Sequence, residues 1–383
     1  MSVAATYFDH NGTTVLDGRV LQAMLPFLTE QHGNATSRHV FGRAARHAIE
    51  QAREQVADAV GAHPSQVIFT GGGTEADNLA ICGISANQPG SQIAISAIEH
   101  PAVTRAAFSM RARGHKIAVV TVDQNGQIEK NDLDAILEKP TSVLSVMLAN
   151  NETGVIQDIA SITEIAKRQG AYMHTDAVQA LGKIKLDFGA LNVHAMSLSA
   201  HKINGPQGAG ALILDKRVDI QPVLHGGGQE KGLRSGTENV AAIVGFGAAC
   251  TLIKQELVQR TCMVRQLRDR LEIGLKNLGA EIFGNKVERI PNTSFFAFPE
   301  IEGETLVMAL DRKGFAVASG SACSSDNTEP SHVLMAMGIE PDLARGAVRV
   351  SFGSGNTPEQ LEAFLTVLEN ELGRLRQLTA IAV

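Results

Sequence analysis

Lys202 lies in a short polar turn, 199–206, that directly follows an apolar run at 195–199. Its neighbours are small or polar, and a glycine and a proline close the turn. A lysine in such a setting can form a Schiff base with an aldehyde, although most lysines are solvated surface residues. The turn alone leaves the role of Lys202 open, so the other polar loops have to decide it.

Further loops place polar residues directly after apolar runs. Glycines and Thr74 follow the run at 67–70, where backbone N–H groups can approach a phosphate, although a plain tight turn explains them equally well. His100 follows the run at 92–96 and is either a capping residue or an imidazole that stacks on a flat ring. Asp176 ends the run at 171–176 and is either a helix N-cap or a carboxylate that keeps a pyridinium nitrogen protonated. Asn151 adds an amide after the run at 142–148.

Cys323 stands in a segment of small and polar residues, which is an unusual setting for a structural cysteine. We expect a mobile loop, because such a thiol can collect sulfur inside a pocket and carry it out to an acceptor. The thiolate is the reactive form, so a nearby group must accept the thiol proton, and His100 is the candidate. The other three cysteines, Cys82, Cys250 and Cys262, lie in apolar helical patterns and are expected to be small buried hydrophobes.

The polar loops need elements that bring them together. Apolar runs of four to eight residues alternate with helical patterns such as 43–60 and 159–168, and a further strand is expected at 209–214. This alternation predicts an α/β fold with a largely parallel sheet, whose ligands bind beyond the carboxyl ends of the strands. After about residue 240 a long helix, 241–278, leads into short strands at 293–298 and 315–318 and helices at 304–312 and 358–375, which predicts a smaller α+β domain.

The bulk composition excludes several classes of protein. The chain has 383 residues, 44% of them hydrophobic and 19% charged, which suits a folded protein of about two domains. The net charge of −6 gives no reason to expect a nucleic-acid ligand. The apolar stretch at 241–253 is shorter than the ~20 residues of a membrane span, and no secretory signal is visible, so we expect a cytoplasmic protein without membrane contact. The cysteine spacing indicates neither a disulfide framework nor a thiolate metal site.

Taken together, these motifs resemble the cysteine desulfurases of iron–sulfur cluster assembly and nitrogen fixation, within the class-V aminotransferase-like branch of pyridoxal phosphate enzymes. The resemblance covers nearly the whole chain and rests on matches at 7–14, 32–37, 72–78, 99–103, 150–154, 174–179, 199–202, 226–230, 234–239 and 319–325. It implies fold type I of the pyridoxal-phosphate-dependent transferases, with a mostly parallel seven-stranded sheet. It also implies a large cofactor-binding domain at 14–258 and a small domain at 1–13 and 259–383 that carries the catalytic loop, about 319–330.

The resemblance also implies roles for single residues. Lys202 would form the Schiff base with pyridoxal 5'-phosphate, Asp176 would bond the ring nitrogen and Gln179 the phenolic oxygen. His100 would stack on the ring and act in catalysis. The other expected cofactor contacts are Gly73, Thr74, Asn151, Ser199, His201 and, from the neighbouring subunit of a homodimer, Thr237. Asn151 and Arg349 would grip the substrate carboxylate, because the planar arginine fork binds carboxylates bidentately; without the resemblance, Arg349 reads as a strand-borne surface residue.

The implied reaction converts L-cysteine to L-alanine and leaves a persulfide on Cys323. The sulfur would pass to an iron–sulfur scaffold or another acceptor protein. The alternative activities are those of a selenocysteine lyase or an aminotransferase that uses the same lysine, and a non-catalytic sulfur carrier with the same fold is the alternative outside the enzymes. The serine-rich segment around Cys323 resembles the group with an extended catalytic loop, and a version dedicated to nitrogenase clusters is open.

Overall fold

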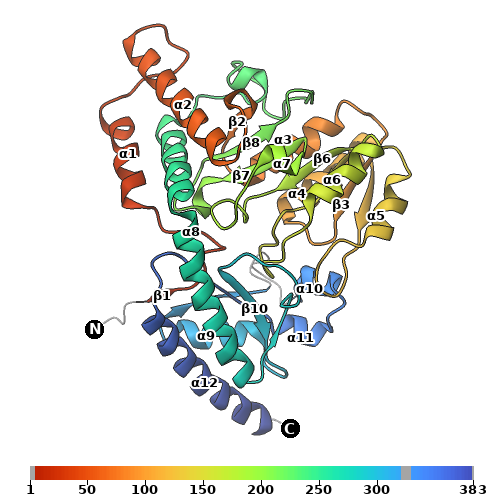
Figure 1. Ribbon diagram of the computed structural model, residues 1–383, viewed down its shortest axis with the longest axis vertical. Helices are drawn as coiled ribbons and strands as arrows, with labels where there is room; N and C mark the ends of the chain where they lie inside the picture. Colours follow the sequence, from red (N-terminus) through yellow and green to blue (C-terminus); the bar gives the residue numbers. More distant parts are fainter. Residues whose placement is uncertain (1–4, 321–328, 382–383) are drawn as a thin grey trace.

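The structure is a computed structural model that describes residues 5–320 and 329–381. The chain folds into two halves, one built on a seven-stranded sheet and one on smaller sheets (Figure 1). The first and the last described elements, Thr6–Tyr7 and Pro358–Ile381, both lie in the second half. The predicted boundaries at 14–258 and 259–383 stay a prediction.

The central sheet has seven strands, as expected. In spatial order they are β2 (Val67–Thr70), β8 (Gly210–Leu214), β7 (Ala195–Ser199), β6 (Tyr172–Asp176), β5 (Thr141–Ser145), β3 (Gln92–Ser96) and β4 (Lys116–Val120). Neighbouring strands from β7 to β4 are parallel, and β8 runs antiparallel to both of its neighbours. The predicted α/β class is therefore confirmed, with one antiparallel strand inserted between β2 and β7.

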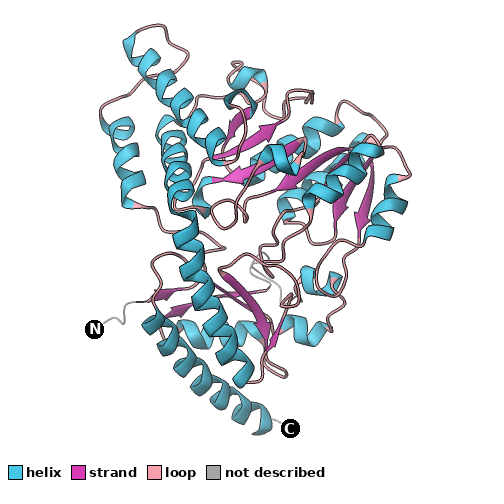
Figure 2. Cartoon of the chain, in the orientation of Figure 1, coloured by secondary structure: helices cyan, strands magenta, loops and turns pink. Residues whose placement is uncertain are grey.

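Helices cover both faces of this sheet (Figure 2). They are α1 (Gly18–Thr29), α2 (Val40–Ala59), α3 (Gly73–Ser85), α4 (Pro101–Ser109), α5 (Lys130–Leu137), α6 (Ile159–Arg168), α7 (Phe188–Leu191) and the first half of α8 (Val240–Asn277). Successive strand residues point to opposite faces, so Phe69 joins the core that includes α2 and α8, and Ile68 joins the core under α3 and α4. Such two-sided burial explains the nearly continuous apolar runs in the sequence.

The strand after α5 ends earlier than predicted. The apolar run reaches residue 148, but regular pairing of β5 ends at Ser145. Val146 N still donates to His174 O at 3.1 Å, and Leu148 N donates to Asp176 O at 2.9 Å. The run therefore continues along β6 with irregular pairing, and hydrophobicity alone could not show where the regular ladder stops.

The second half is a small α+β domain. Its strands are β1 (Thr6–Tyr7), β9 (Glu281–Ile282), β10 (Thr293–Ala297), β11 (Phe315–Ala316), β12 (Ala318–Ser319) and β13 (Val348–Ser351), and its helices are α9 (Gly303–Asp311), α10 (His332–Ala336), α11 (Pro341–Arg345) and α12 (Pro358–Ile381). β1 pairs in parallel with β11, which ties the first residues into this domain. Phenylalanines such as Phe8, Phe296 and Phe364 fill its core.

Helix α8 connects the two halves along one side of the molecule (Figure 1). Phe246 and Ile253 pack in the core of the large sheet, whereas Leu267 and Leu275 pack in the phenylalanine core. Of the helices in the described ranges, α8 is the one whose length and composition would suffice for a membrane crossing, and 50% of that apolar window is buried inside the fold. A long core helix passes the same test, so the prediction of no membrane contact stays a prediction.

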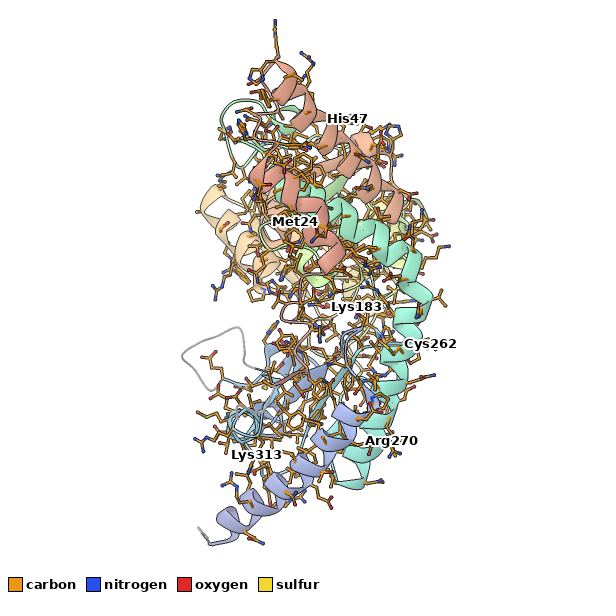
Figure 3. All side chains as sticks on the ribbon, turned by 90° about the vertical axis from the view of Figure 1, so that its left-hand side faces the viewer. Met24, His47, Lys183, Cys262, Arg270 and Lys313 are labelled. Atoms are coloured by element: carbon orange, nitrogen blue, oxygen red, sulfur yellow. The ribbon has the colours of Figure 1, made fainter. Side chains whose placement is uncertain are left out.

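The three cysteines in the described residues differ in burial. Cys250 is buried and Cys82 is partly buried, but Cys262 is exposed on α8 (Figure 3). The expectation of a buried Cys262 is therefore wrong. This cysteine lies between the stretch of α8 that packs on the large sheet and the stretch that packs on the small domain, so neither core covers it.

Candidate active site

The polar loops meet in one cavity of about 220 Å³ at the carboxyl edge of the seven-stranded sheet. It is lined by Gly73, Thr74, Asp77, His100, Met147, Asn151, Asp176, Val178, Gln179, Ser199, His201 and Lys202. These residues follow β2, β3, β5, β6 and β7, whose ends point to the same edge. The structure thus brings together every predicted cofactor residue except Thr237, and the roles assigned to them stay predictions.

One end of the cavity is built to receive an anion. Helix α3 begins there at Gly73 without a side-chain cap, so the backbone N–H groups of its first turn are not capped by a side chain. The hydroxyl oxygen of Ser199 is buried and has no hydrogen-bond partner among the described residues. An unfilled donor beside an uncapped helix start fits the phosphate group of pyridoxal phosphate.

Glycine is required at the start of α3. A Cβ at position 73 would lie 2.8 Å from Cγ2 of Val178 and 3.5 Å from Cβ of Ser199. The preceding Gly72 has φ 152°, a conformation that side chains other than hydrogen disfavour. The two glycines therefore let the helix start lie against β7 and the turn after β6.

Asp176 is the residue in the cavity best suited to carry negative charge. Burial raises its pKa to about 6, while the N–H of Val178, at 2.8 Å from Oδ1, and the nearby Lys202 lower it. Burial raises the pKa of Glu99 to about 8, and burial together with Asp176 holds the pKa of Asp77 well above its usual value. Buried acids that lie close together do not all ionise, so at neutral pH the charge resides on Asp176.

Asp176 does not cap a helix, because the next α-helix begins at Phe188. The helix-cap interpretation of Asp176 is therefore wrong for this carboxylate, which instead bonds the turn that follows β6. A buried carboxylate facing the cavity has the chemistry needed to bond a protonated ring nitrogen.

His100 caps a helix and also lines the cavity, and its stacking on a ring stays a prediction. Its Nδ1 accepts a hydrogen bond from Ala102 N at 3.1 Å, which makes it the N-cap of α4. The ring also lines the cavity. Burial lowers its pKa to about 4, with Lys202 and His332 adding to the effect. The imidazole is therefore neutral near pH 7, and with Nδ1 accepting, the proton sits on Nε2.

Lys202 reaches the cavity from the turn η3 (Ala200–Lys202) after β7. Its Nζ donates to the main-chain oxygens of Asn11 at 2.5 Å and Gly12 at 2.6 Å. These carbonyls belong to the N-terminal segment that follows β1 of the small domain. The amine is thus held at the edge of the cavity by two acceptors that carry no charge.

Asn11 joins the cavity to both halves of the molecule. Its Nδ2 donates to Asn151 O at 3.2 Å and to Thr293 Oγ1 at 2.8 Å. Its main-chain oxygen accepts from Gln179 Nε2 at 3.1 Å as well as from Lys202. Every polar group of this buried side chain is therefore used, and the N-terminal segment is fixed against the sheet edge.

Arg349 lies beside the cavity on β13 but does not line it. Its Nη1 donates to Asn151 O at 2.9 Å, and its Nη2 donates to Asp9 Oδ1 at 2.7 Å. Its buried Nε has no partner among the described residues. The structure therefore joins the two predicted carboxylate-binding residues, Asn151 and Arg349, through a main-chain contact, and their binding of substrate stays a prediction.

Two predicted residues are not brought into the cavity. Thr237 is exposed in the loop before α8 and takes no part in the lining within this single chain. Cys323 lies outside the described residues. The first described residues that follow it lead to Ser331, which caps α10 and donates a short hydrogen bond to Glu152 in the loop after β5.

Sequence reasoning missed Asp77, Asn11 and Lys183. Asp77 follows Gly73 by four residues and so lies on the same side of α3, a spacing that could have identified it. Asn11 lies in one of the motifs that carried the family resemblance. Lys183 is buried four residues after Gln179 and had no local signal that distinguished it from a surface lysine.

Comparisons with known proteins agree with this geometry. The model for the family "Aminotransferase class-V" matches residues 6–364. The cysteine desulfurase IscS of Methanosarcina thermophila is 41% identical over 380 residues, which cover 98% of this chain and 94% of that protein. A solved NifS-like protein superposes with a TM-score of 0.91 at 38% identity, over 96% of this chain and 99% of its own.

A third similar protein is SspA, solved in complex with cysteine, which matches with a TM-score of 0.80 at 28% identity over 92% of this chain and 99% of its own. Enzymes of this family use pyridoxal phosphate, and the uncapped helix start, the unpartnered Ser199 hydroxyl and the buried Asp176 fit that cofactor. The chain therefore belongs to the class-V aminotransferase family, on its pyridoxal-phosphate-dependent cysteine desulfurase branch.

Proposed function

We propose that this protein takes the sulfur atom of free L-cysteine onto Cys323 as a persulfide and releases L-alanine. The observation that carries the proposal is the single cavity in which Lys202, Asp176 and His100 converge. The relatives named cysteine desulfurase support the substrate, as does the similar SspA structure, which holds cysteine. The position of Cys323 within a serine-rich segment supports the acceptor.

Three residues of the cavity have defined tasks in this reaction. When bound, pyridoxal phosphate supplies an aldehyde for amines and a ring that accepts electrons. Asp176 would hold a negative charge toward the ring nitrogen of the bound cofactor and so favour its protonated form. The Lys202 amine, held by two main-chain oxygens, moves the Cα proton of the substrate.

His100 would stack on the ring of the bound cofactor, since its imidazole lines the cavity. Its Nδ1 is occupied by the N–H of Ala102, so accepting the thiol proton requires that this cap be released. We therefore assign His100 first to ring contact and second to proton transfer. The pH dependence of the reaction tests whether His100 also transfers a proton.

The sulfur step is balanced without an external oxidant or reductant. The thiolate of Cys323 attacks the substrate sulfur, the Cβ–S bond breaks, and a new S–S bond forms on the enzyme. The electron pair of the Cβ–S bond stays with the carbon skeleton, which gains protons and leaves as alanine. The persulfide then passes its outer sulfur to an acceptor protein, which we take to be an iron–sulfur scaffold in the cytoplasm.

We further propose a homodimer in which the Thr237 loop of each subunit completes the site of the other. A shallow hollow of about 720 Å³ adjoins the phosphate end of the cavity, beside Ser199 and His201. Val223 and Leu224, which line it, are 46% and 45% exposed in the single chain. An apolar rim next to an open phosphate site supports a second chain at this place.

The decisive test compares two cysteine variants. Cys323→Ser should abolish alanine release from L-cysteine and remove the mass increase of one sulfur on the protein, while the yellow cofactor band remains. Cys262→Ser changes an exposed thiol that does not line the cavity and serves as the matched control. Normal turnover by Cys323→Ser would refute the proposal. The same assay with selenocysteine, or with a 2-oxo acid as amino acceptor, separates a lyase of selenocysteine from an aminotransferase.

A further inference from the structure

A second lysine lies beside the cofactor site and has no part in the reaction above. Lys183 is 8% exposed and follows Gln179 by four residues in the turn after β6. Its Nζ donates to Gln179 Oε1 at 2.5 Å and to Asn11 Oδ1 at 3.0 Å. Figure 3 shows it at the level where the two halves of the molecule meet. The part of the chain that the structure describes records no ion pair for it.

Lys183 is not an alternative to Lys202 as the residue that binds the cofactor. It does not line the 220 Å³ cavity, which Lys202 and Gln179 do. It lines a separate small cavity of about 50 Å³, together with Lys202, His10 and Asn292. Gln179 bonds the Lys183 amine and also lines the cofactor cavity, so it is a direct contact through which Lys183 can act on the cofactor.

Burying an ammonium group without a counter-charge lowers the stability of the fold, which indicates that this buried amine serves a function. Burial lowers the pKa of Lys183 well below its usual value, and the charges of Lys202 and Arg349 lower it further. Both hydrogen-bond partners are amide oxygens, which accept from a neutral amine as well as from an ammonium. The two recorded bonds need only two N–H groups, so the contact survives loss of the charge.

The contact decides which way the Gln179 amide points. Its Oε1 is occupied by Lys183, and one N–H of its Nε2 is used by the main-chain oxygen of Asn11. The remaining N–H is the donor that Gln179 can offer to the cavity. A flipped amide would place Oε1 against the main-chain oxygen of Asn11, acceptor against acceptor, and would take the amide oxygen away from the lysine amine.

We propose that Lys183 is a positioning residue that fixes the Gln179 amide as a hydrogen-bond donor toward an oxygen on the cofactor ring. The proposal rests on the cofactor site and not on the cysteine chemistry. The Lys183 amine also bonds Asn11. One lysine side chain therefore positions both the amide oxygen of Gln179 and the loop whose main-chain oxygens hold Lys202.

The test is a double-mutant cycle on cofactor affinity. Cofactor-free protein is titrated with pyridoxal phosphate, and the apparent Kd is read from the visible band. Lys183→Met should raise the Kd about tenfold, the size expected for loss of one well-placed hydrogen bond. Gln179→Ala should raise it by a similar factor, and the double variant should bind no more weakly than Gln179→Ala alone, because Lys183 acts through Gln179. Factors that multiply in the double variant would overturn the proposal.

A control and a second variant keep the result interpretable. Lys185→Met changes an exposed lysine two residues away and should leave both the Kd and the absorption maximum unchanged. If Lys183→Met does not fold, Gln179→Glu replaces the donating NH₂ by an oxygen while keeping the contact with Lys183. It should show the same loss of affinity, and wild-type affinity in Gln179→Glu would refute the donor role. Because the readout is binding, these results stand apart from the outcome with Cys323→Ser.

Discussion

The carboxyl edge of the seven-stranded sheet and the phenylalanine core of the small domain are both buried, but they bury different chemistry. At the sheet edge, Glu99 and Lys183 are buried with hydrogen bonds to neutral groups. In the small domain one buried charged group, Arg289, is paired with Glu272 at 2.8 Å, and another, Arg349, is paired with Asp9 at 2.7 Å. Uncompensated buried groups cost stability, whereas paired charges and apolar rings do not cost it to the same degree.

This contrast separates the two tasks of the molecule. The phenylalanine core supplies apolar burial, with Phe364 packed edge-on against Phe8 and Phe315 at ring distances of 5.5 and 5.4 Å. The sheet edge buries titratable groups whose pKa values are shifted, and their burial lowers the stability of the protein. Substitutions in the core should therefore lower stability and leave the site intact, whereas substitutions at the edge should act mainly on the site and on the pH dependence of stability.

The largest expected effect is on folding. Phe364→Ala should lower the free energy of unfolding by about 3–5 kcal/mol, because a fully buried ring is lost and a cavity remains. Urea denaturation measures the loss, and the visible cofactor band of the folded fraction should keep its position. A shifted band would show that the core and the sheet edge are not separable.

The next effect is on catalysis. Asp176→Ala should lower kcat/KM for L-cysteine by about 10²–10³-fold, the size of losing one preorganised charge in an active site. The cofactor-free variant should be no less stable than the parent, since a buried carboxylate with a raised pKa is removed. Asp219→Ala on the surface is the control. A collapse of the melting temperature would assign Asp176 to the fold instead.

A smaller effect concerns pH. Burial raises the pKa of Glu99 from 4.5 to about 8, so between these values the folded protein binds a proton that the unfolded chain has lost. Its contribution to stability is therefore lost as pH rises through that window, by about 1 kcal/mol between pH 6 and pH 7. Glu99→Gln stays neutral, so the stability of the variant relative to the parent should rise with pH, whereas exposed Glu164→Gln should show no trend. A flat difference curve for Glu99→Gln would contradict the raised pKa.

The smallest effect tests the surface between the two regions. Cys262 is exposed on α8 and should react with a thiol reagent in the native protein, whereas buried Cys250 should react only after unfolding. Cys262→Ser should change the free energy of unfolding by no more than about 0.5 kcal/mol. Protection of Cys262 from the reagent would show that another surface covers this part of α8 in solution.

The order of elements and most of the cavity could be predicted from the sequence. Strands buried on both faces read as continuous apolar runs, and the polar residue after each run must lie at the carboxyl edge of a parallel sheet. This rule predicts that Thr74, His100, Asp176 and Lys202 share one site, and the structure places all four in the same cavity. It needs only local periodicity, which the chain carries in every segment.

Tertiary structure alone decided which side chains hold those residues in place. Lys183 and Asn11 are 172 positions apart, and their contact depends on the pairing of β1 with β11 in the small domain. The exposure of Cys262 depends likewise on where two cores leave a gap along one helix. A local sequence pattern indicates which face of a helix or strand is buried. It does not indicate which distant segment packs on that face, because that contact is set by the packing of the whole chain.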